Sequence, residues 1–312
     1  MMRLRQVERL EVACLVDNTA DAMLSNNEIA KRDPARSDWD SRPLFAEHGF
    51  SVLLSLKSDG GTHSLLFDTG LDPLAAPNNA AAMNLDLSRC DAVALSHGHV
   101  DHFGGLLTVK RSMGAGRVPL ILHPYALRTR YSKLRGGKYL PAPPPDRVKL
   151  SEAGYDVLEK KEASLWVNES VLVTGQIPRK NEFETGVPNH YSEVDGRIRL
   201  DPLVEDDQAV VVKVKRKGLI VITGCGHSGL INTLAYAKEL TGEDRVYAAM
   251  GGMHLAGRLF ENRIPRTMKE LKKLNPRFII PCHCSGLRMM SELMCQMPGA
   301  FVQNSVGTRY TF

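Results

Sequence analysis

Short apolar runs alternate with polar turns along most of the chain, and these runs predict a series of β-strands. We expect a strand wherever about four to eight apolar or alternating residues stand between turn-forming residues. The predicted strands are 10–16, 50–56, 64–67, 90–95, 119–123, 163–167, 170–174, 208–215, 219–223, 245–250, 277–280, 301–302 and 308–312. Many of them are followed by glycine, histidine or aspartate, so polar side chains come directly after the predicted buried strands.

Helical spacing appears between these strands. The predicted helices are 73–85, 105–113, 230–240, 265–274 and a methionine-rich segment that ends at 297. Strands followed by helices occur twice in succession, which indicates an α/β protein with two sheets covered by helices. No linker divides the chain, so we expect a single domain over residues 1–312 with loop insertions at about 19–47 and 124–147.

The insertions are polar and irregular. We interpret 19–47 as a flap near the functional site, because long loops in compact domains are usually functional. The segment 124–147 is rich in arginine and lysine and contains a proline run. It is either a solvated basic loop or a wall of the substrate pocket that attracts anions. The segment 181–208 is also predicted to be a loop.

Composition narrows the possible classes of protein. Of the 312 residues, 43% are hydrophobic and 24% are charged, which is typical of a globular core. No apolar run reaches the length of a membrane span, and the charged N-terminus lacks the apolar core of a signal peptide. A net charge of +5 permits an anionic substrate but does not indicate nucleic acid. Six cysteines form no disulfide framework, and several adjoin histidines, so we expect a reducing cytoplasm.

The strongest chemical signal is the sequence HxHxDH after the strand 90–95. It places His97, His99, Asp101 and His102 within six residues, on a loop that a rigid sheet can aim. Neutral imidazole binds zinc, iron or manganese, and a carboxylate suits a harder ion or a bridging position. Ligands this close together are difficult to direct at one ion. We therefore expect two adjacent metals, with His97 and His99 facing one and Asp101 and His102 the other.

Three later strands are also followed by a histidine within two residues of glycine or cysteine: His227, His254 and His283. Each alone is more often a structural residue, but the repetition favours one shared metal site. Asp68 ends the strand 64–67, where it either orients a ligand histidine or caps the turn.

These motifs resemble the metallo-β-lactamase superfamily. The resemblance covers nearly the whole chain and is nearest to a branch labelled as dihydropterin-ribofuranosyl-aminobenzene phosphate synthase-like metal-dependent hydrolases. It depends on HxHxDH and on the segments 16–18, 47–51, 66–70, 223–229, 251–255, 281–284 and 306–308. The resemblance implies an αβ/βα sandwich of two mixed sheets flanked by helices, with a dinuclear metal site along one edge.

The resemblance also implies roles for individual residues. His97, His99, Asp101 and His102 match the first metal motif of the superfamily, and His283 matches its last ligand histidine. The turn 174–178 has no histidine where other members have one, so His227 is the candidate for that ligand. Cys225 stands where a bridging aspartate is common, and its thiolate either bridges the metals or only packs.

The implied function is a metal-dependent hydrolase that acts on an ester or phosphoester-type bond of a small, anionic substrate. Two divalent ions, zinc in preference to iron or manganese, would activate a water molecule. Asp101 would hold that water and accept its proton, and His254 would act on the leaving group. His48 and Arg179 are candidates for binding the substrate. The alternatives are a transferase that joins a dihydropterin diphosphate to an arylamine ribofuranosyl phosphate, and a non-catalytic metal-binding or sensory module.

Overall fold

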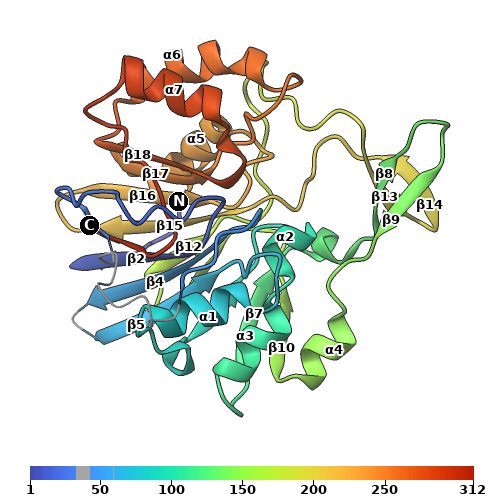
Figure 1. Cartoon of the computed structure of the whole chain (residues 1–312), viewed down its shortest axis with the longest axis horizontal. Helices are drawn as coiled ribbons and strands as arrows, with labels where there is room; N and C mark the ends of the chain where they lie inside the picture. The colour runs from blue at the N-terminus through green and yellow to red at the C-terminus, as the bar shows by residue number, and fades with distance from the viewer. Residues whose placement is uncertain (33–42, 59) are drawn as a thin grey trace.

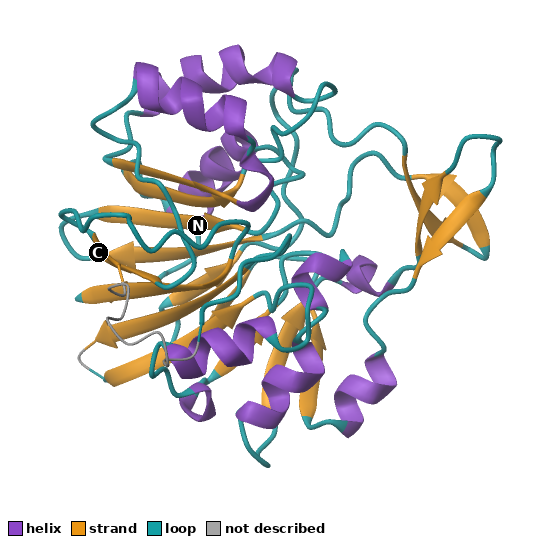
Figure 2. Ribbon diagram, in the orientation of Figure 1, coloured by secondary structure: helices purple, strands orange, loops and turns teal. Residues whose placement is uncertain are grey.

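Two large β-sheets lie face to face, and helices cover the outer face of each (Figures 1 and 2). This computed structural model describes residues 1–32, 43–58 and 60–312. Buried side chains from both sheets, among them Phe50, Val212, Ile220 and Tyr310, form the core between them. The predicted αβ/βα sandwich of two mixed sheets flanked by helices is therefore confirmed.

The first large sheet comes mainly from the N-terminal half of the chain. In the described residues its strand order is β10-β7-β6-β5-β4-β2-β19-β3. Its strands are β2 (Arg9–Val16), β3 (Ala30–Arg32), β4 (Ser51–Ser58), β5 (Gly61–Phe67), β6 (Ala92–Ala94), β7 (Val118–Leu122), β10 (Tyr155–Glu159) and β19 (Thr308–Thr311). The helices on its outer side are α1 (Ala75–Ala82), α2 (Val100–Phe103), α3 (Leu106–Ser112) and α4 (Arg147–Glu152), with the short 3₁₀ turns η1 (Leu87–Arg89) and η2 (Pro124–Leu127).

The second large sheet has the order β11-β12-β15-β16-β17-β18 in the described residues, and β1 pairs with β15. Its strands are β1 (Gln6–Val7), β11 (Ser164–Trp166), β12 (Val171–Val173), β15 (Ala209–Val214), β16 (Gly218–Thr223), β17 (Val246–Gly252) and β18 (Phe278–Cys282). Its covering elements are α5 (Leu230–Thr241), α6 (Ile264–Leu274), α7 (Leu287–Gln296), η3 (Glu261–Arg263) and η4 (His283–Ser285). In α6, the buried Ile264, Met268 and Leu271 recur at helical spacing and contact the sheet side.

The polar segments 124–147 and 181–208 form a third, small sheet that projects from one end of the sandwich (Figure 1). It consists of β8 (Arg130–Lys133), β9 (Tyr139–Ala142), β13 (His190–Val194) and β14 (Arg197–Leu200). The prediction of loops in these segments is wrong. Half-buried tyrosine rings, rather than a buried apolar face, pack across this sheet, with Tyr139 and Tyr191 centred 5.1 Å apart. The strands consequently show little apolar alternation.

Other predictions fare better. Most predicted strands and helices are present with bounds shifted by a few residues, as is usual at element ends. The predicted flap 19–47 contains the short strand β3, and its residues 33–42 lie outside the described residues. No described helix is both long and apolar enough to cross a membrane. The single-domain organisation stays a prediction.

The parallel strands bring the ligand turns to one edge of the sandwich. Strands β5 and β6 run parallel in the first sheet, and β16, β17 and β18 run parallel in the second. Parallel strands end on the same side of their sheet. The turns that follow these five strands hold Asp68, His97 to His102, His227, His254 and His283.

Candidate metal centre

The HxHxDH turn connects β6 to α2. Leu95 and Ser96 are buried after the strand, and His99 is the last residue before the helix begins at Val100. The strand fixes one side of the turn and the helix the other, so the side chains of His97 to His102 lie on a short, well-held segment. Gly98 between the two histidines leaves no room for a side chain, because the backbone of Ala126 packs against its Cα.

Three ring nitrogens converge to form the first donor set: His97 Nε2, His99 Nδ1 and His227 Nε2. The distance from His97 Nε2 to His99 Nδ1 is 2.8 Å, and His227 Nε2 lies 3.1 Å from the former and 3.2 Å from the latter. Burial is the main cause that lowers the pKa of each of these histidines, which favours the neutral imidazole. Neutral imidazoles with converging nitrogens are the form that binds a metal ion.

The second donor set surrounds the Oδ2 atom of Asp101. His283 Nε2 lies 3.4 Å from this oxygen and His102 Nε2 lies 3.7 Å from it. The exposed ring of His48 is also close, with its Nε2 at 3.6 Å. Burial alone would raise the pKa of Asp101, but His102 and His283 hold it well below the usual carboxyl value. The set therefore offers one ionised carboxylate and up to three imidazoles to an ion.

Asp68 and Ser96 determine which nitrogen of His97 and His102 carries a proton. The buried Asp68 carboxylate accepts hydrogen bonds from the Ser96 hydroxyl and from His102 Nδ1, both at 2.7 Å. Because the hydroxyl proton is used there, Ser96 Oγ must accept from His97 Nδ1, 2.9 Å away. Both rings therefore direct Nε2 into the centre. The predicted role of Asp68 in orienting a ligand depends on metal binding and stays a prediction.

The turns after β16 and β17 bring Cys225 and His254 to the same place. Cys225 Sγ lies 3.3 Å from Cys284 Sγ, and both thiols are buried. Burial and this contact raise the pKa of Cys225. The His254 ring packs on His227, with their centroids 4.2 Å apart, and its φ of 45° is in the left-handed region. Cys225, His227 and His254 could together hold an ion.

The main chain around His283 is held by the N-terminal strand end. Asp17 Oδ1 accepts a hydrogen bond from the His283 N–H at 2.6 Å, and Asn18 Nδ2 donates to the His283 carbonyl at 2.9 Å. Both backbone groups of this residue are thus satisfied, and its ring is directed toward Asp101.

Arg179 lies behind the turn that carries His227. Its guanidinium donates to the carbonyls of Ile177 and Leu203, and one of its nitrogens lies 3.5 Å from the His227 carbonyl. These contacts stabilise the ligand turn from the rear. A contact with substrate stays a prediction.

The sequence interpretation missed four residues around the centre: Ser96, Arg130, His190 and Asp206. His190 Nε2 lies 2.9 Å from His99 Nε2, and Arg130 forms a buried ion pair with Asp206. Arg130 and His190 come from the polar segments that were predicted as loops. The Asp195-Gly196 pair was the available signal, because Asp-Gly favours a two-residue hairpin turn, and it joins β13 to β14 here.

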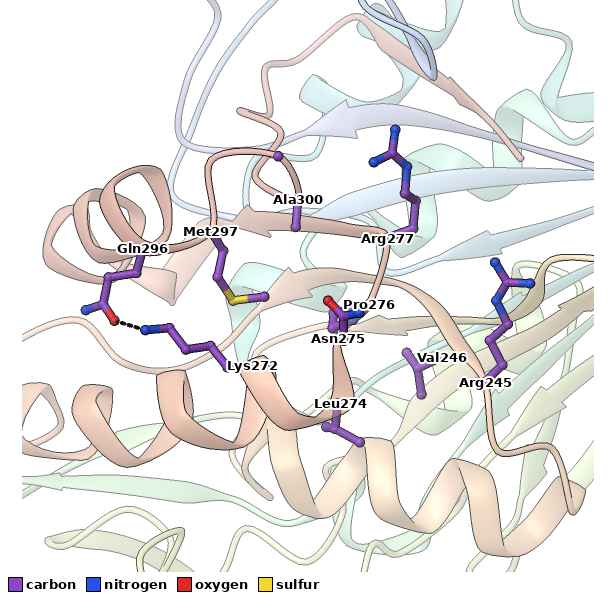
Figure 3. Close-up of a pocket in the computed structure, with 11 residues that line it drawn as sticks. Arg245, Val246, Lys272, Leu274, Asn275, Pro276, Arg277, Gln296, Met297 and Ala300 are labelled. Atoms are coloured by element: carbon purple, nitrogen blue, oxygen red, sulfur yellow. Dashed lines mark hydrogen bonds between the residues drawn. The ribbon is translucent and has the colours of Figure 1, made fainter.

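A separate surface pocket lies at the opposite ends of β17 and β18 (Figure 3). Its lining includes Arg245 and Arg277, which directly precede these strands, and Lys272 from α6. Lys272 donates a hydrogen bond to Gln296. Since the donor sets follow the ends of β17 and β18, this pocket is distant from the metal centre along the strands.

The sequence model of the metallo-beta-lactamase superfamily matches residues 46–240, which include the HxHxDH turn, His227 and Cys225. The chain belongs to this superfamily. The resemblance seen in the sequence is thereby confirmed. The superfamily is one of metal-dependent enzymes, which agrees with the donor sets described above.

Individual relatives in this superfamily extend over most of the chain. It is 30% identical, over 81% of its own length and 85% of the relative, to the 7,8-dihydropterin-6-methyl-4-(beta-D-ribofuranosyl)-aminobenzene-5'-phosphate synthase of Methanocaldococcus jannaschii. Among solved structures, Tm1679, a metal-dependent hydrolase of the beta-lactamase superfamily, is 26% identical with a TM-score of 0.72 and covers 96% of this chain and 98% of its own. YhfI from Bacillus subtilis, at 11% identity and a TM-score of 0.54 over 97% of this chain and 100% of its own, shares the fold.

Proposed function

We propose that this chain is a metal-dependent hydrolase that acts on an ester or phosphoester-type bond of a small, anionic substrate. The observation that carries the proposal is the pair of adjacent donor sets on one turn. His97 and His99 belong to one set, and Asp101 and His102 to the other. Two divalent ions, if held by these adjacent sets, would supply a metal-activated water and polarise the scissile bond.

The donor atoms fit two divalent ions. His102 Nε2 and both ring nitrogens of His283 are buried and have no hydrogen-bond partner among the described residues. Buried polar atoms are almost always paired, so unpaired nitrogens that face an ionised carboxylate favour a cation there. His97, His99 and His227 would hold the first ion, and Asp101, His102 and His283 the second. Nitrogen-rich donors favour zinc over iron or manganese.

When bound, such ions lower the pKa of a water molecule and polarise the scissile bond. The protein groups then have distinct tasks. Asp101, which is ionised, would orient the water and accept its proton. His254 and the exposed His48 stand at the margin of the donor sets, where either can contact the substrate or protonate a leaving group. A net charge of +5 supports an anionic substrate.

The cysteines support a reducing compartment such as the cytoplasm. All six are free thiols in the structure. Cys225 and Cys284 lie at 3.3 Å without a bond between them, although their sulfur atoms are close enough to react under oxidising conditions. We propose that the protein works where such thiols remain reduced.

A second candidate function is a transferase that joins a dihydropterin diphosphate to an arylamine ribofuranosyl phosphate. The specific observation in its favour is that the Methanocaldococcus jannaschii relative, which is 30% identical to this chain, is named as a synthase of this kind. Metal ions held by the same donor sets would then bind the diphosphate leaving group, and an arylamine nitrogen would replace water as the nucleophile.

Product analysis separates the two functions. The protein is purified without a histidine tag, loaded with zinc, and given either a panel of esters and phosphoesters or a dihydropterin diphosphate with the arylamine. We expect hydrolysis of at least one phosphoester. A coupled pterin product without hydrolysis would replace the hydrolase proposal with the transferase.

Two variants link that activity to the donor sets. His99→Ala removes a nitrogen from the first set, so we expect it to lose bound metal and turnover. His63→Ala is the matched control, because His63 lies on β5 and contacts Asn168 and Asp91, away from the centre. If His99→Ala kept both its metal content and its activity, the assignment of the site would be wrong.

A further inference from the structure

The small third sheet reaches the metal centre through its first residue in β13. His190 opens this strand and pairs with Ser132 of β8, while Arg130 at the start of β8 pairs with Ser192. The pairing places the side chains of His190 and Arg130 together. His190 is largely buried, and its ring packs against that of His99, with centroids 5.1 Å apart.

Hydrogen bonds decide where the proton of His190 lies. His190 Nδ1 is 2.8 Å from the main-chain carbonyl of Asp201, and a carbonyl only accepts, so Nδ1 carries a proton. Arg130 Nη1 lies 3.2 Å from His190 Nε2. A guanidinium only donates, so Nε2 carries no proton and accepts. If the His190 ring carried both protons, its Nε2–H would face the N–H donor of Arg130 Nη1, which is unfavourable.

The proton of His99 follows from that of His190. His99 Nε2 lies 2.9 Å from His190 Nε2, which carries no proton, so His99 Nε2 must be a donor that shares the single lone pair of this atom with Arg130 Nη1. A neutral imidazole carries one proton, and His99 Nδ1 is then a bare lone pair. This Nδ1 atom is the one that faces His97 Nε2 and His227 Nε2 at 2.8 and 3.2 Å. His97 Nε2 is also bare, because its Nδ1 donates to Ser96, so the 2.8 Å contact joins two lone pairs that a cation would hold together.

We propose that His190 is a positioning residue that fixes the tautomer of His99 and thereby presents His99 Nδ1 to the first metal ion. The inference rests on the proposed metal site and deepens it. Asp68 and Ser96 perform this task for His97 and His102, and His190 performs it for the remaining histidine of the turn. The third sheet thus contributes directly to the centre.

Arg130 and Asp206 hold the backbone beneath the same histidine. Arg130 Nε donates to the Gly98 carbonyl at 3.1 Å, and Asp206 Oδ2 accepts from the Gly98 N–H at 2.8 Å. The buried ion pair between the two side chains closes this arrangement. Backbone and ring of the segment that carries His99 are therefore both tied to groups supplied by, or adjacent to, the third sheet.

The first test measures the tautomer directly in metal-free protein. Nitrogen-15 NMR of labelled histidine distinguishes a protonated Nε2 from a protonated Nδ1. We expect Nε2–H for His99 in the parent protein and in His190→Gln, whose side-chain oxygen can accept and whose amide can donate to Asp201. His190→Leu can do neither, so we expect a mixture of tautomers. His99 with its proton on Nδ1 in the parent protein would overturn the proposal.

The second test is zinc binding by the same three proteins. Partners of ligand histidines typically contribute about 10- to 100-fold in metal affinity. We expect His190→Leu to weaken the first ion by this factor and His190→Gln to restore most of it. A circular dichroism spectrum that matches the parent excludes misfolding, and equal affinity of His190→Leu and the parent would overturn the proposal. Because neither readout uses a substrate, a failure of the hydrolase proposal would leave both results unchanged.

Discussion

The HxHxDH turn and the later ligand turns hold their histidines in different ways. In the HxHxDH turn, each ring nitrogen that faces away from the centre has a partner: Ser96 for His97, His190 for His99 and Asp68 for His102. In the later turns, His227 Nδ1 and both nitrogens of His254 and His283 have none among the described residues.

The later histidines are positioned by backbone instead. Asp17 and Asn18 bind the main chain of His283, and Asp207 accepts a hydrogen bond from the N–H of Ser228, the residue after His227. The ring of His283 faces the Asp101 carboxylate, and the ring of His227 packs against those of His97, His99 and His254. From this comparison we expect the first turn to be preorganised before an ion binds, and the later rings to take their final orientation when an ion binds. Preorganised ligands avoid the free-energy cost of ordering on binding.

The largest effect should come from removing the preorganisation at Asp68. In Asp68→Asn, Oδ1 can still accept from the Ser96 N–H, which is 2.7 Å from the carboxylate in the parent protein. Burial would lower the pKa of His102, but the charges of Asp101 and Asp68 raise it to about 9, so loss of the Asp68 charge favours the neutral ring. The new amide donates where His102 Nδ1 donated, so the one proton of that neutral ring must lie on Nε2, inside the centre. We expect metal affinity to fall by about 10- to 100-fold, as measured by zinc titration.

Asp86→Asn is the control for this prediction. Asp86 is an exposed residue that caps η1 by accepting from the Ser88 N–H, and asparagine caps as well as aspartate. It should bind zinc as the parent does. Parent-like affinity in Asp68→Asn would show that the first turn needs no fixed tautomers and would remove the difference between the turns.

The sequence predicts those parts of the molecule that have a periodic pattern or a motif of their own. The strands and helices of the sandwich bury one face, so their periodicity predicts them, and HxHxDH predicts its own position after β6. The hydrogen-bond partners of its ring nitrogens are harder to predict from the sequence. Asp68 could be identified because it ends an apolar strand. His190 and Arg130 lie in strands without a buried apolar face, and their contact with the turn depends on the tertiary placement of the third sheet.

An effect of intermediate size should come from the Arg130–Asp206 ion pair, which connects the third sheet to the HxHxDH turn. Burial would raise the pKa of Asp206, but the charge and hydrogen bond of Arg130 hold this pKa at about 2, below the ordinary value of 3.8. A carboxyl with a lower pKa in the folded state stabilises the fold above its unfolded pKa and loses this contribution as the pH falls. The contribution should therefore decline between about pH 4 and pH 2, by on the order of 2 kcal/mol.

Urea unfolding of metal-free protein measures this decline. The difference in the free energy of unfolding between the parent and Asp206→Asn should be largest at pH 6 and should narrow toward pH 2. Asp195→Asn, at an exposed turn position with φ of 51° that asparagine tolerates, should give a difference that does not vary with pH. A pH-independent difference for Asp206→Asn would mean that the ion pair does not hold the turn through charge.

The smallest effect should come from the thiols of the later turns. Cys225 Sγ lies within reach of both donor sets, since it groups with His97 and His102 and also with His283 and Cys284. A thiolate is a better zinc ligand than a hydroxyl. Burial raises the pKa of Cys225, however, so forming this thiolate costs free energy that offsets much of its benefit as a ligand. Cys225→Ser should therefore weaken the second ion by less than the roughly 10-fold lower limit expected for the partners of ligand histidines. Cobalt(II) substitution reports on this directly, because a bound thiolate adds a charge-transfer band near the ultraviolet.

Two further serine variants make the result specific. Cys284→Ser should change the charge-transfer band less than Cys225→Ser does, because Cys284 contacts Cys225. Cys295→Ser should leave the band unchanged, because Cys295 is exposed. If the cobalt spectra of Cys225→Ser and Cys284→Ser both matched that of the parent, both thiols would only pack beside the centre. The later turns would then supply imidazole alone, and the contrast with the HxHxDH turn would lie entirely in how the ring nitrogens are held rather than in the kind of ligand.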